Sequence, residues 1–139
     1  MKIYLASPFF NAQELDYVDR AEKILRKRGY EVYSPREHEV RDETVGTATW
    51  SMATFEADRI GIDKSDIVVM LYHGNYSDSG TAWECGYAFA THTPVLVVHL
   101  GEDSNLMVHE GSHANLTMDE LKTYDFDRMP LQRYTGPMF

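Results

Sequence analysis

The sequence lacks the features by which several large protein classes are recognised. Its 139 residues include one cysteine, Cys85, which excludes an internal disulfide and suits a reducing compartment. No apolar run approaches the ~20 residues of a membrane-spanning helix. The opening MKIYLASPFF has too short an apolar run for a signal peptide. We therefore expect a cytoplasmic protein that does not enter membranes.

Positive charge is also scarce, with 13 Lys and Arg against 22 Asp and Glu and a net charge of −9. Nucleic-acid binding needs a basic surface for the phosphates, so we expect no nucleic-acid partner and a small, weakly charged ligand instead. The glycine-rich phosphate motifs GxGxxG and GxxxxGK[ST] do not occur. The pair His109 and His113 lacks a third metal ligand. We predict neither a metal nor a cofactor.

Alternating apolar runs and amphipathic stretches predict an α/β fold. The expected strands are KIYLAS, YEVYS, DIVVMLY and TPVLVVHL, and the last two are continuous apolar runs typical of buried parallel strands. The expected helices cover residues 11–29, 48–62 and about 81–91, with a short one in MDELKTY. We found no internal repeat or linker, so the sequence predicts one domain, residues 1–139. Its doubly wound parallel sheet should have about five strands and helices on both faces.

The stretch DSGTAWECGYAFA, residues 78–90, places Glu84 among uncharged residues. We expect Glu84 in the first helical turn after DIVVMLY, near the carboxyl ends of the strands, where such folds bind ligands. A glutamate there can simply complement the helix dipole. Together with Asp78 it also makes a carboxylate pair suited to cleaving a bond to an anomeric carbon. The helix terminus favours the ionised form of Glu84, whereas burial raises its pKa, and the sequence does not decide between them.

Other residues are ambiguous between structural and functional roles. Asp58 lies late in a predicted helix, where a carboxylate opposes the dipole, and it projects to the same side as Trp50. A solvated surface position would also explain it. Phe9 and Phe10 follow the first strand, and consecutive side chains of an extended chain point in opposite directions. We expect at least one to line the pocket and stack on a flat ligand. Cys85 is expected to be a buried packing thiol.

Four features together resemble the nucleoside 2-deoxyribosyltransferases, along essentially the whole chain. They are IYLASPFF, the spacing from Trp50 to Asp58, DSGTAWECGYA and NLM (105–107). The resemblance implies a flavodoxin-like fold. It also implies an enzyme that exchanges the base of a 2'-deoxynucleoside through a covalent glutamyl–deoxyribosyl intermediate, with retention of configuration. The implied partners are 2'-deoxynucleosides and free nucleobases. Self-association is implied as well, as a hexamer built from three dimers or as a dimer.

The resemblance also implies a role for each matching residue. Glu84 corresponds to the nucleophile and Tyr4 to the tyrosine that hydrogen-bonds it. Asp58 and Asp78 correspond to the carboxylates that help to protonate the base. The implied substrate contacts are Phe9, Phe10, Trp50, Gly80, Asn105 and Met107. Of these, Asn105 and Met107 would reach into the site of a neighbouring subunit.

Two alternatives share this fold. A hydrolase of deoxynucleoside monophosphates would need a phosphate site rich in Gly, Ser and Arg after the first strand. This chain has SPFFNAQELD there, and Arg20 is the next basic residue. A non-catalytic nucleotide-sensing module would not need Glu84, Asp58 and Asp78 together. Residues 35–46, where Arg36 and Glu37 are candidate base contacts, do not match the family pattern, so the choice between purine and pyrimidine bases stays open.

Overall fold

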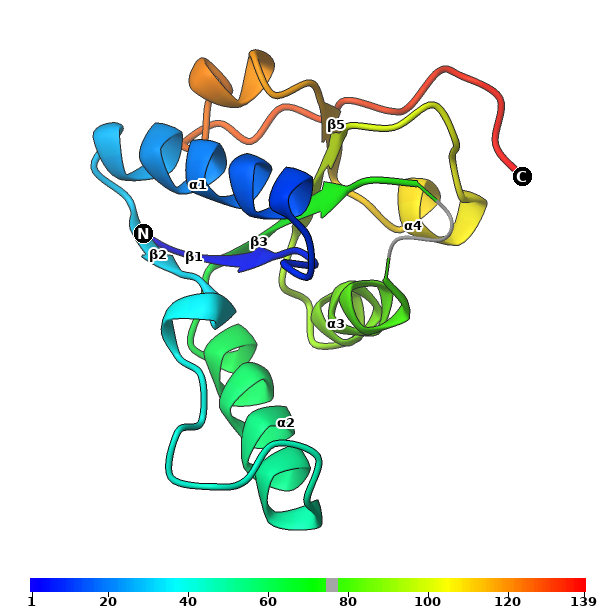
Figure 1. Ribbon diagram of the computed structural model, residues 1–139. Coiled ribbons are helices and arrows are strands. Elements are labelled where there is room, and N and C mark those ends of the chain that lie inside the picture. Colours follow the sequence, from blue (N-terminus) through cyan, green and yellow to red (C-terminus); the bar gives the residue numbers. More distant parts are fainter. Residues whose placement is uncertain (75–77) are drawn as a thin grey trace.

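A computed structural model describes residues 1–74 and 78–139 of the chain (Figure 1). Within these residues, a five-stranded sheet has the order β2-β1-β3-β4-β5, and all neighbouring strands are parallel. The strands are β1 (Lys2–Ala6), β2 (Glu31–Tyr33), β3 (Ile67–Tyr72), β4 (Val95–His99) and β5 (Ala114–Leu116). This strand order is that of flavodoxin-like folds, which confirms the predicted fold class.

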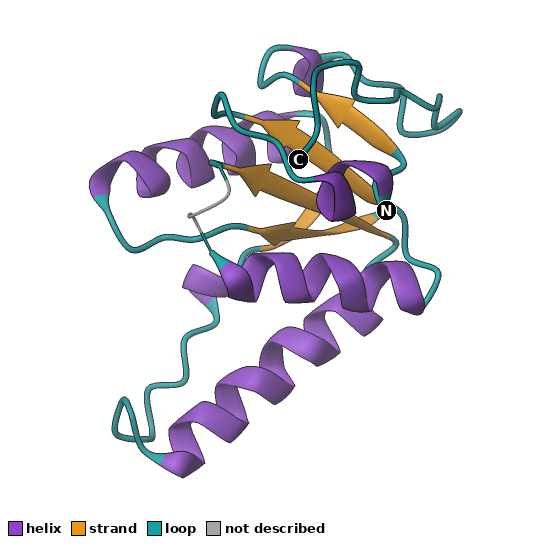
Figure 2. Ribbon diagram, turned by 90° about the vertical axis from the view of Figure 1, so that its right-hand side faces the viewer, coloured by secondary structure: helices purple, strands orange, loops and turns teal. Residues whose placement is uncertain are grey.

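Helices cover both faces of the sheet, as predicted (Figures 1 and 2). One face carries α1 (Ala12–Lys27), and the other carries α2 (Ala48–Asp63) and α3 (Ser79–Ala90). The short helix α4 (Leu106–Glu110) lies beside α3. The 3₁₀ turns η1 (Pro35–Glu37) and η2 (Glu120–Lys122) complete the described elements. None of the helices in the described residues combines the length and the apolar character needed to cross a membrane.

The core is divided by the alternation of side chains along each strand. In β1, Ile3 and Leu5 point to the α1 side, whereas Tyr4 and Ala6 point to the side of α2 and α3. All six residues of β3 are buried. Burial on both faces explains why the central strands are continuous apolar runs. It also means that Tyr4 carries a hydroxyl into a fully buried layer.

Helix α3 begins two residues earlier than the sequence analysis predicted. The Asp78 side chain accepts hydrogen bonds from the backbone N–H groups of Gly80 and Thr81, at 3.0 and 3.1 Å, and so acts as the N-cap. Glu84 is consequently the sixth residue of the helix, in its second turn. The expectation that Glu84 lies in the first turn was wrong, because the motif aspartate caps the helix.

Two elements were not located from the sequence. α4 has five residues and β5 has three, so neither gives a readable periodic pattern. The expected helix in MDELKTY is a single 3₁₀ turn. In addition, the amino-terminal half of α2 and the connection before it extend away from the sheet (Figure 1). Val45 and Met52 on this projection are 73% and 68% exposed.

Candidate active site

A hydrogen bond joins β1 to α3 at the centre of the candidate site. The Tyr4 hydroxyl donates to Oε1 of Glu84 at 3.1 Å. Burial, followed by the negative charges of Glu84 and Asp58, raises the pKa of Tyr4 above its ordinary value. The phenol therefore keeps its proton and acts only as a donor. A buried donor on a rigid strand restricts the orientation of the Glu84 carboxyl group.

The surroundings of Glu84 determine whether burial or the helix terminus has the larger effect on its pKa. Burial raises the pKa of Glu84 to about 8, and the nearby charge of Asp58 adds to the increase. The hydrogen bond from Tyr4 opposes this shift, and Asp78 reinforces it. The second-turn position also takes Glu84 beyond the free N–H groups of the first turn. Burial therefore outweighs the helix terminus.

Asp58 lies on α2 and lines the same cavity as Glu84. Asp58 is half-buried, and this burial raises the pKa of its carboxyl group to about 6. The solvated surface position considered from the sequence is therefore wrong. Because the two carboxyl groups interact, they titrate as a pair with apparent pKa values of about 6 and about 8. Between these values the pair holds one proton.

Asp78 differs from Asp58 in its hydrogen bonds. Its carboxylate accepts from Gly80 N, Thr81 N and the Thr81 hydroxyl at the start of α3. In residues 1–74 and 78–139, the Asp58 carboxylate accepts no hydrogen bond. Asp78 is therefore committed to capping α3, while Asp58 is available to exchange a proton.

The cavity between α2 and α3 has a volume of about 520 Å³. Its lining residues are Phe55, Asp58, Arg59, Ser79, Gly80, Trp83 and Glu84. Phe55 and Trp83 contact each other edge to face, with ring centroids 5.2 Å apart. Neither ring was predicted from the sequence to be a site residue. Phe55 precedes Asp58 by three residues and Arg59 by four, so the three side chains share one face of a helix. This spacing could have identified Phe55 from the sequence.

The other predicted aromatic contacts are not among the lining residues of this cavity. Phe9 packs against the core on the α1 side, and Phe10 is 75% exposed with its ring stacked on Phe9. Trp50 lies in the first turn of α2, on the part of the helix that projects beyond the sheet (Figure 1). Among the residues that the structure describes, none of the three lines the cavity between α2 and α3. Cys85 is buried as predicted, and burial raises the pKa of its thiol.

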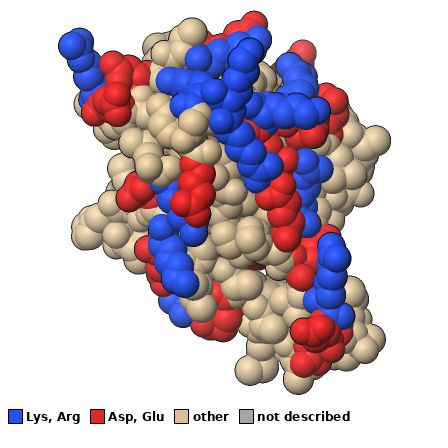
Figure 3. All heavy atoms as spheres, turned by 90° about the vertical axis from the view of Figure 1, so that its left-hand side faces the viewer, with Lys and Arg blue, Asp and Glu red and all other residues tan. Residues whose placement is uncertain are grey.

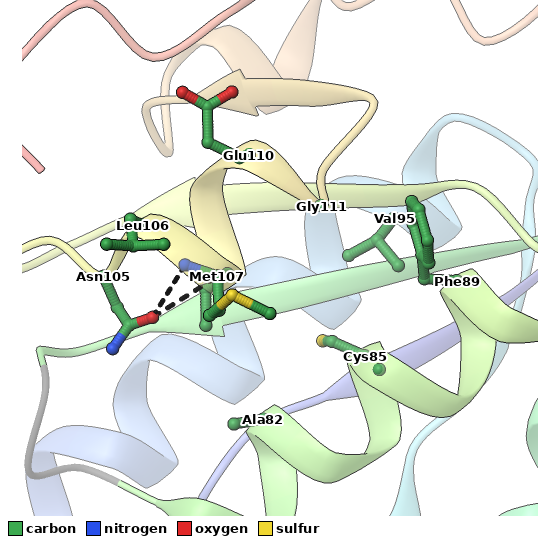
Figure 4. A pocket seen from close by; sticks show the side chains of 11 residues that line it. Ala82, Cys85, Phe89, Val95, Asn105, Leu106, Met107, Glu110 and Gly111 are labelled. Carbon is green, nitrogen blue, oxygen red and sulfur yellow. Dashed lines mark hydrogen bonds between the residues drawn. The ribbon is translucent and has the colours of Figure 1, made fainter.

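Asn105 and Met107 line a second hollow, which lies between α4 and the face of α3 that carries Ala82 and Cys85 (Figure 4). This groove has a volume of about 660 Å³ and is bordered by Ala82, Gly86 and Phe89 of α3. The Asn105 side chain caps α4 by accepting from Met107 N at 3.0 Å. Met107 is 76% exposed. The family resemblance implied that both residues reach the site of a neighbouring subunit, and within one chain α3 separates them from Glu84.

The candidate base contacts in residues 35–46 are engaged elsewhere. Arg36 forms an ion pair with the buried Glu22 of α1, and Glu37 accepts from Arg26 of α1 at 2.6 Å. Both candidates are therefore used to attach η1 to α1. One face of the molecule carries many basic and acidic side chains interspersed with each other (Figure 3). In the described residues, no group of three or more His, Cys, Asp and Glu side chains could hold a metal ion.

Comparisons with known proteins identify relatives of the chain. The family model described as nucleoside 2-deoxyribosyltransferase matches residues 3–118. A nucleoside deoxyribosyltransferase of Lactobacillus johnsonii is 30% identical over 118 residues, which cover 77% of this chain and 79% of the relative.

Solved structures agree with this match. A 2-deoxyribosyltransferase of Bacillus psychrosaccharolyticus superimposes with a TM-score of 0.91 at 37% identity, covering 97% of this chain and all of the other. The CMP N-glycosidase of Clostridium botulinum has a TM-score of 0.64 at 19% identity, covering 89% of this chain and all of the other, so it shares the fold alone. The chain therefore belongs to the nucleoside 2-deoxyribosyltransferase family, as the motifs in its sequence indicated.

Proposed function

We propose that residues 1–139 form one catalytic unit that transfers the 2-deoxyribosyl group between bases of 2'-deoxynucleosides through a covalent ester on Glu84. The observation that supports this most directly is the Tyr4–Glu84 hydrogen bond beside a cavity shared with Asp58. A nucleophile, a group that orients it and a proton donor are thereby close together. The substrates are 2'-deoxynucleosides and free nucleobases.

In the first half-reaction, a carboxylate oxygen of Glu84 bonds to C1' of the sugar while the bond from C1' to the base nitrogen breaks. The electron pair of the broken bond goes to the base, which takes the proton from Asp58. In the second half, a nitrogen of the incoming base attacks C1', Glu84 leaves as a carboxylate, and Asp58 takes the proton that this nitrogen loses. Two successive inversions give net retention.

The number of protons held by the Asp58–Glu84 pair is compatible with these two half-reactions. The pair holds one proton between pH values of about 6 and about 8. Because Glu84 has the higher pKa, most of the singly protonated pair carries this proton on Glu84. The reactive form is the minor arrangement in which the proton has moved to Asp58, so that Glu84 is ionised when it attacks and Asp58 can protonate the base. Partial burial of Glu84 also limits the access of water to the ester, which favours transfer to a base over hydrolysis.

We also propose that the working site is shared between subunits. The groove that contains Asn105 and Met107 lies on the other side of α3 from Glu84, and Phe89, Leu106 and Met107 on its rim are exposed. Exposed apolar side chains on neighbouring elements mark surfaces that a partner covers. The exposed examples on α2, α3 and α4 are Met52, Phe55, Ile60, Trp83, Phe89, Leu106 and Met107. Asn105 and Met107 would then approach the sugar bound by an adjacent copy, in a dimer or a hexamer.

The monophosphate hydrolase has less support. The segment after β1 contains Glu14, whose carboxylate accepts from Phe10 N at 2.7 Å. A carboxylate at this point disfavours a phosphate group.

One assay tests the proposed activity. The protein is incubated with deoxyinosine and free adenine, and the products are separated by chromatography. Transfer predicts deoxyadenosine and hypoxanthine. Free deoxyribose without deoxyadenosine would indicate hydrolysis and contradict the proposal.

A further inference from the structure

Tyr33, the last residue of β2, lies beside the site without lining its cavity. It is the register partner of Tyr4 in β1, and the two rings stack with their centroids 5.4 Å and their planes 13° apart. Aligned residues of neighbouring parallel strands point to the same face, here the side of α2 and α3. The ring that directs a hydroxyl group to Glu84 is therefore supported by the ring of Tyr33.

The hydroxyl group of Tyr33 makes a second connection. It donates to the backbone carbonyl of Ala57 at 3.2 Å, and Ala57 directly precedes Asp58 in α2. Burial, then the charges of Asp58 and Glu84, raise the pKa of Tyr33, so the phenol keeps the proton that it donates. One side chain thus contacts both the tyrosine that orients Glu84 and the backbone that carries Asp58.

Gly61 of α2 leaves space for this ring. A Cβ atom at position 61 would lie 2.8 Å from Cε1 of Tyr33, which is too close for unshifted neighbours. Glycine inside a helix costs ~1 kcal/mol relative to alanine, so helix propensity does not account for Gly61. His38 stacks on Tyr33 as well, at 4.0 Å and 3°. The ring is therefore confined by contacts with Tyr4, His38 and Gly61.

We propose that Tyr33 is a positioning residue for deoxyribosyl transfer. Its ring holds the Tyr4 hydroxyl against Glu84, and its hydroxyl group holds the α2 backbone at Asp58. Gly61 is the residue that makes this placement possible. The inference rests on the proposed roles of Glu84 and Asp58, and Tyr33 acts through Tyr4 and Ala57 without touching the substrate.

The test measures kcat, KM and the pH dependence of kcat for variants of the full chain with deoxyinosine and adenine. Tyr33→Leu removes the stacked ring and should lower kcat about 10- to 100-fold with little change in KM, because small misplacements of reacting groups are costly. Tyr33→Phe keeps the ring and should lose only about three- to tenfold. In Tyr33→Leu, the alkaline limb of the pH profile should move to higher pH, since the Tyr4 hydrogen bond favours ionised Glu84.

A double-mutant cycle tests the role of Gly61. Gly61→Ala should lower kcat in the wild-type background by displacing the Tyr33 ring. The same change in the Tyr33→Leu background should alter kcat less than about twofold, because the ring that it would displace is gone. If Tyr33→Leu does not fold, the kcat values of Tyr33→Phe and Gly61→Ala, compared with the wild type, test the inference instead.

Tyr30→Leu is the matched control. Tyr30 packs edge to face on Phe126 against the other side of the sheet, with ring centroids 4.8 Å apart. This variant should lower stability but leave kcat and the pH limbs unchanged. Unchanged kcat and pH limbs in the Tyr33 and Gly61 variants would overturn the inference, as would an equal Gly61→Ala loss in both backgrounds. A wild-type protein that forms no deoxyribosyl adduct on Glu84 would instead contradict the proposed function.

Discussion

The two sides of α3 differ in chemistry. Toward α2, the helix presents Glu84 to a cavity that also contains Asp58. Toward α4, Ala82, Gly86 and Phe89 form an apolar groove with exposed Met107. Spacings of three and four residues place the groove residues on one helical face and leave Glu84 on another. One helix can therefore form a wall of its own site and a surface for a neighbouring subunit.

The largest expected effect is on the α2 side, at the nucleophile. Glu84→Ala should reduce transfer by at least about 10³-fold while the protein stays folded, because the covalent step is lost. Mass spectrometry of the wild type with a deoxynucleoside and no acceptor should detect a deoxyribosyl adduct on the peptide that contains Glu84. An adduct localised to Asp78 or Cys85 would refute this assignment.

The next effect separates Asp58 from Asp78. Asp58→Asn should lower the rate ~10²–10⁴-fold with ordinary bases, since general acids contribute this much, and far less with a nitrophenol leaving group. Asp78→Asn should show a smaller dependence on the leaving group, because Asp78 caps α3. Equal losses of Asp58→Asn across all leaving groups would indicate a structural role for Asp58.

The free energy of unfolding should depend on pH because the Glu84 carboxyl group is buried. The folded-state pKa of Glu84 lies above its ordinary value, so its stabilising contribution is complete below pH 4.5 and is lost as the pH rises through about 8. Glu84→Gln removes this dependence and should be more stable than the wild type by about 2–4 kcal/mol at pH 8–9, but not at pH 4. Urea unfolding at both pH values measures the difference. A difference that does not change with pH would contradict the assigned burial.

The carboxyl pair of Asp58 and Glu84 should give the transfer rate a bell-shaped dependence on pH. Transfer should be greatest between about pH 6 and about pH 8 and should fall roughly tenfold per pH unit outside this range, because only the singly protonated pair is reactive. In Asp58→Asn the alkaline decline should disappear, since no second proton remains to be lost. An alkaline limb that persists in this variant would assign the acid to another group.

The smallest single-residue effect is expected on the α4 side of α3. Asn105→Ala should cost about three- to tenfold in kcat/KM, the equivalent of one neutral hydrogen bond. An Asn105/Met107 double alanine variant should be weaker still. Mixing it with Glu84→Ala should restore part of the activity, since some sites then combine an intact Glu84 with an intact neighbour. No recovery after verified subunit exchange would mean that each site is built within one chain.

The sequence alone was sufficient for the α/β class, the helices on both faces and the family. These depend on local patterns, because apolar runs, helical spacing and short motifs such as DSGTAWE can be read within a few residues. The elements that it missed, α4 and β5, are too short to carry such a pattern.

The tertiary structure decided which groups meet and what surrounds them. Tyr4 and Glu84 are 80 positions apart, and only the packing of α3 on β1 brings their side chains together. The raised pKa of Glu84 follows from burial by several elements, which no local pattern encodes. For the same reason, the sequence could name Asn105 and Met107 but could not place them on the far side of α3, where the path of the chain after β4 puts them.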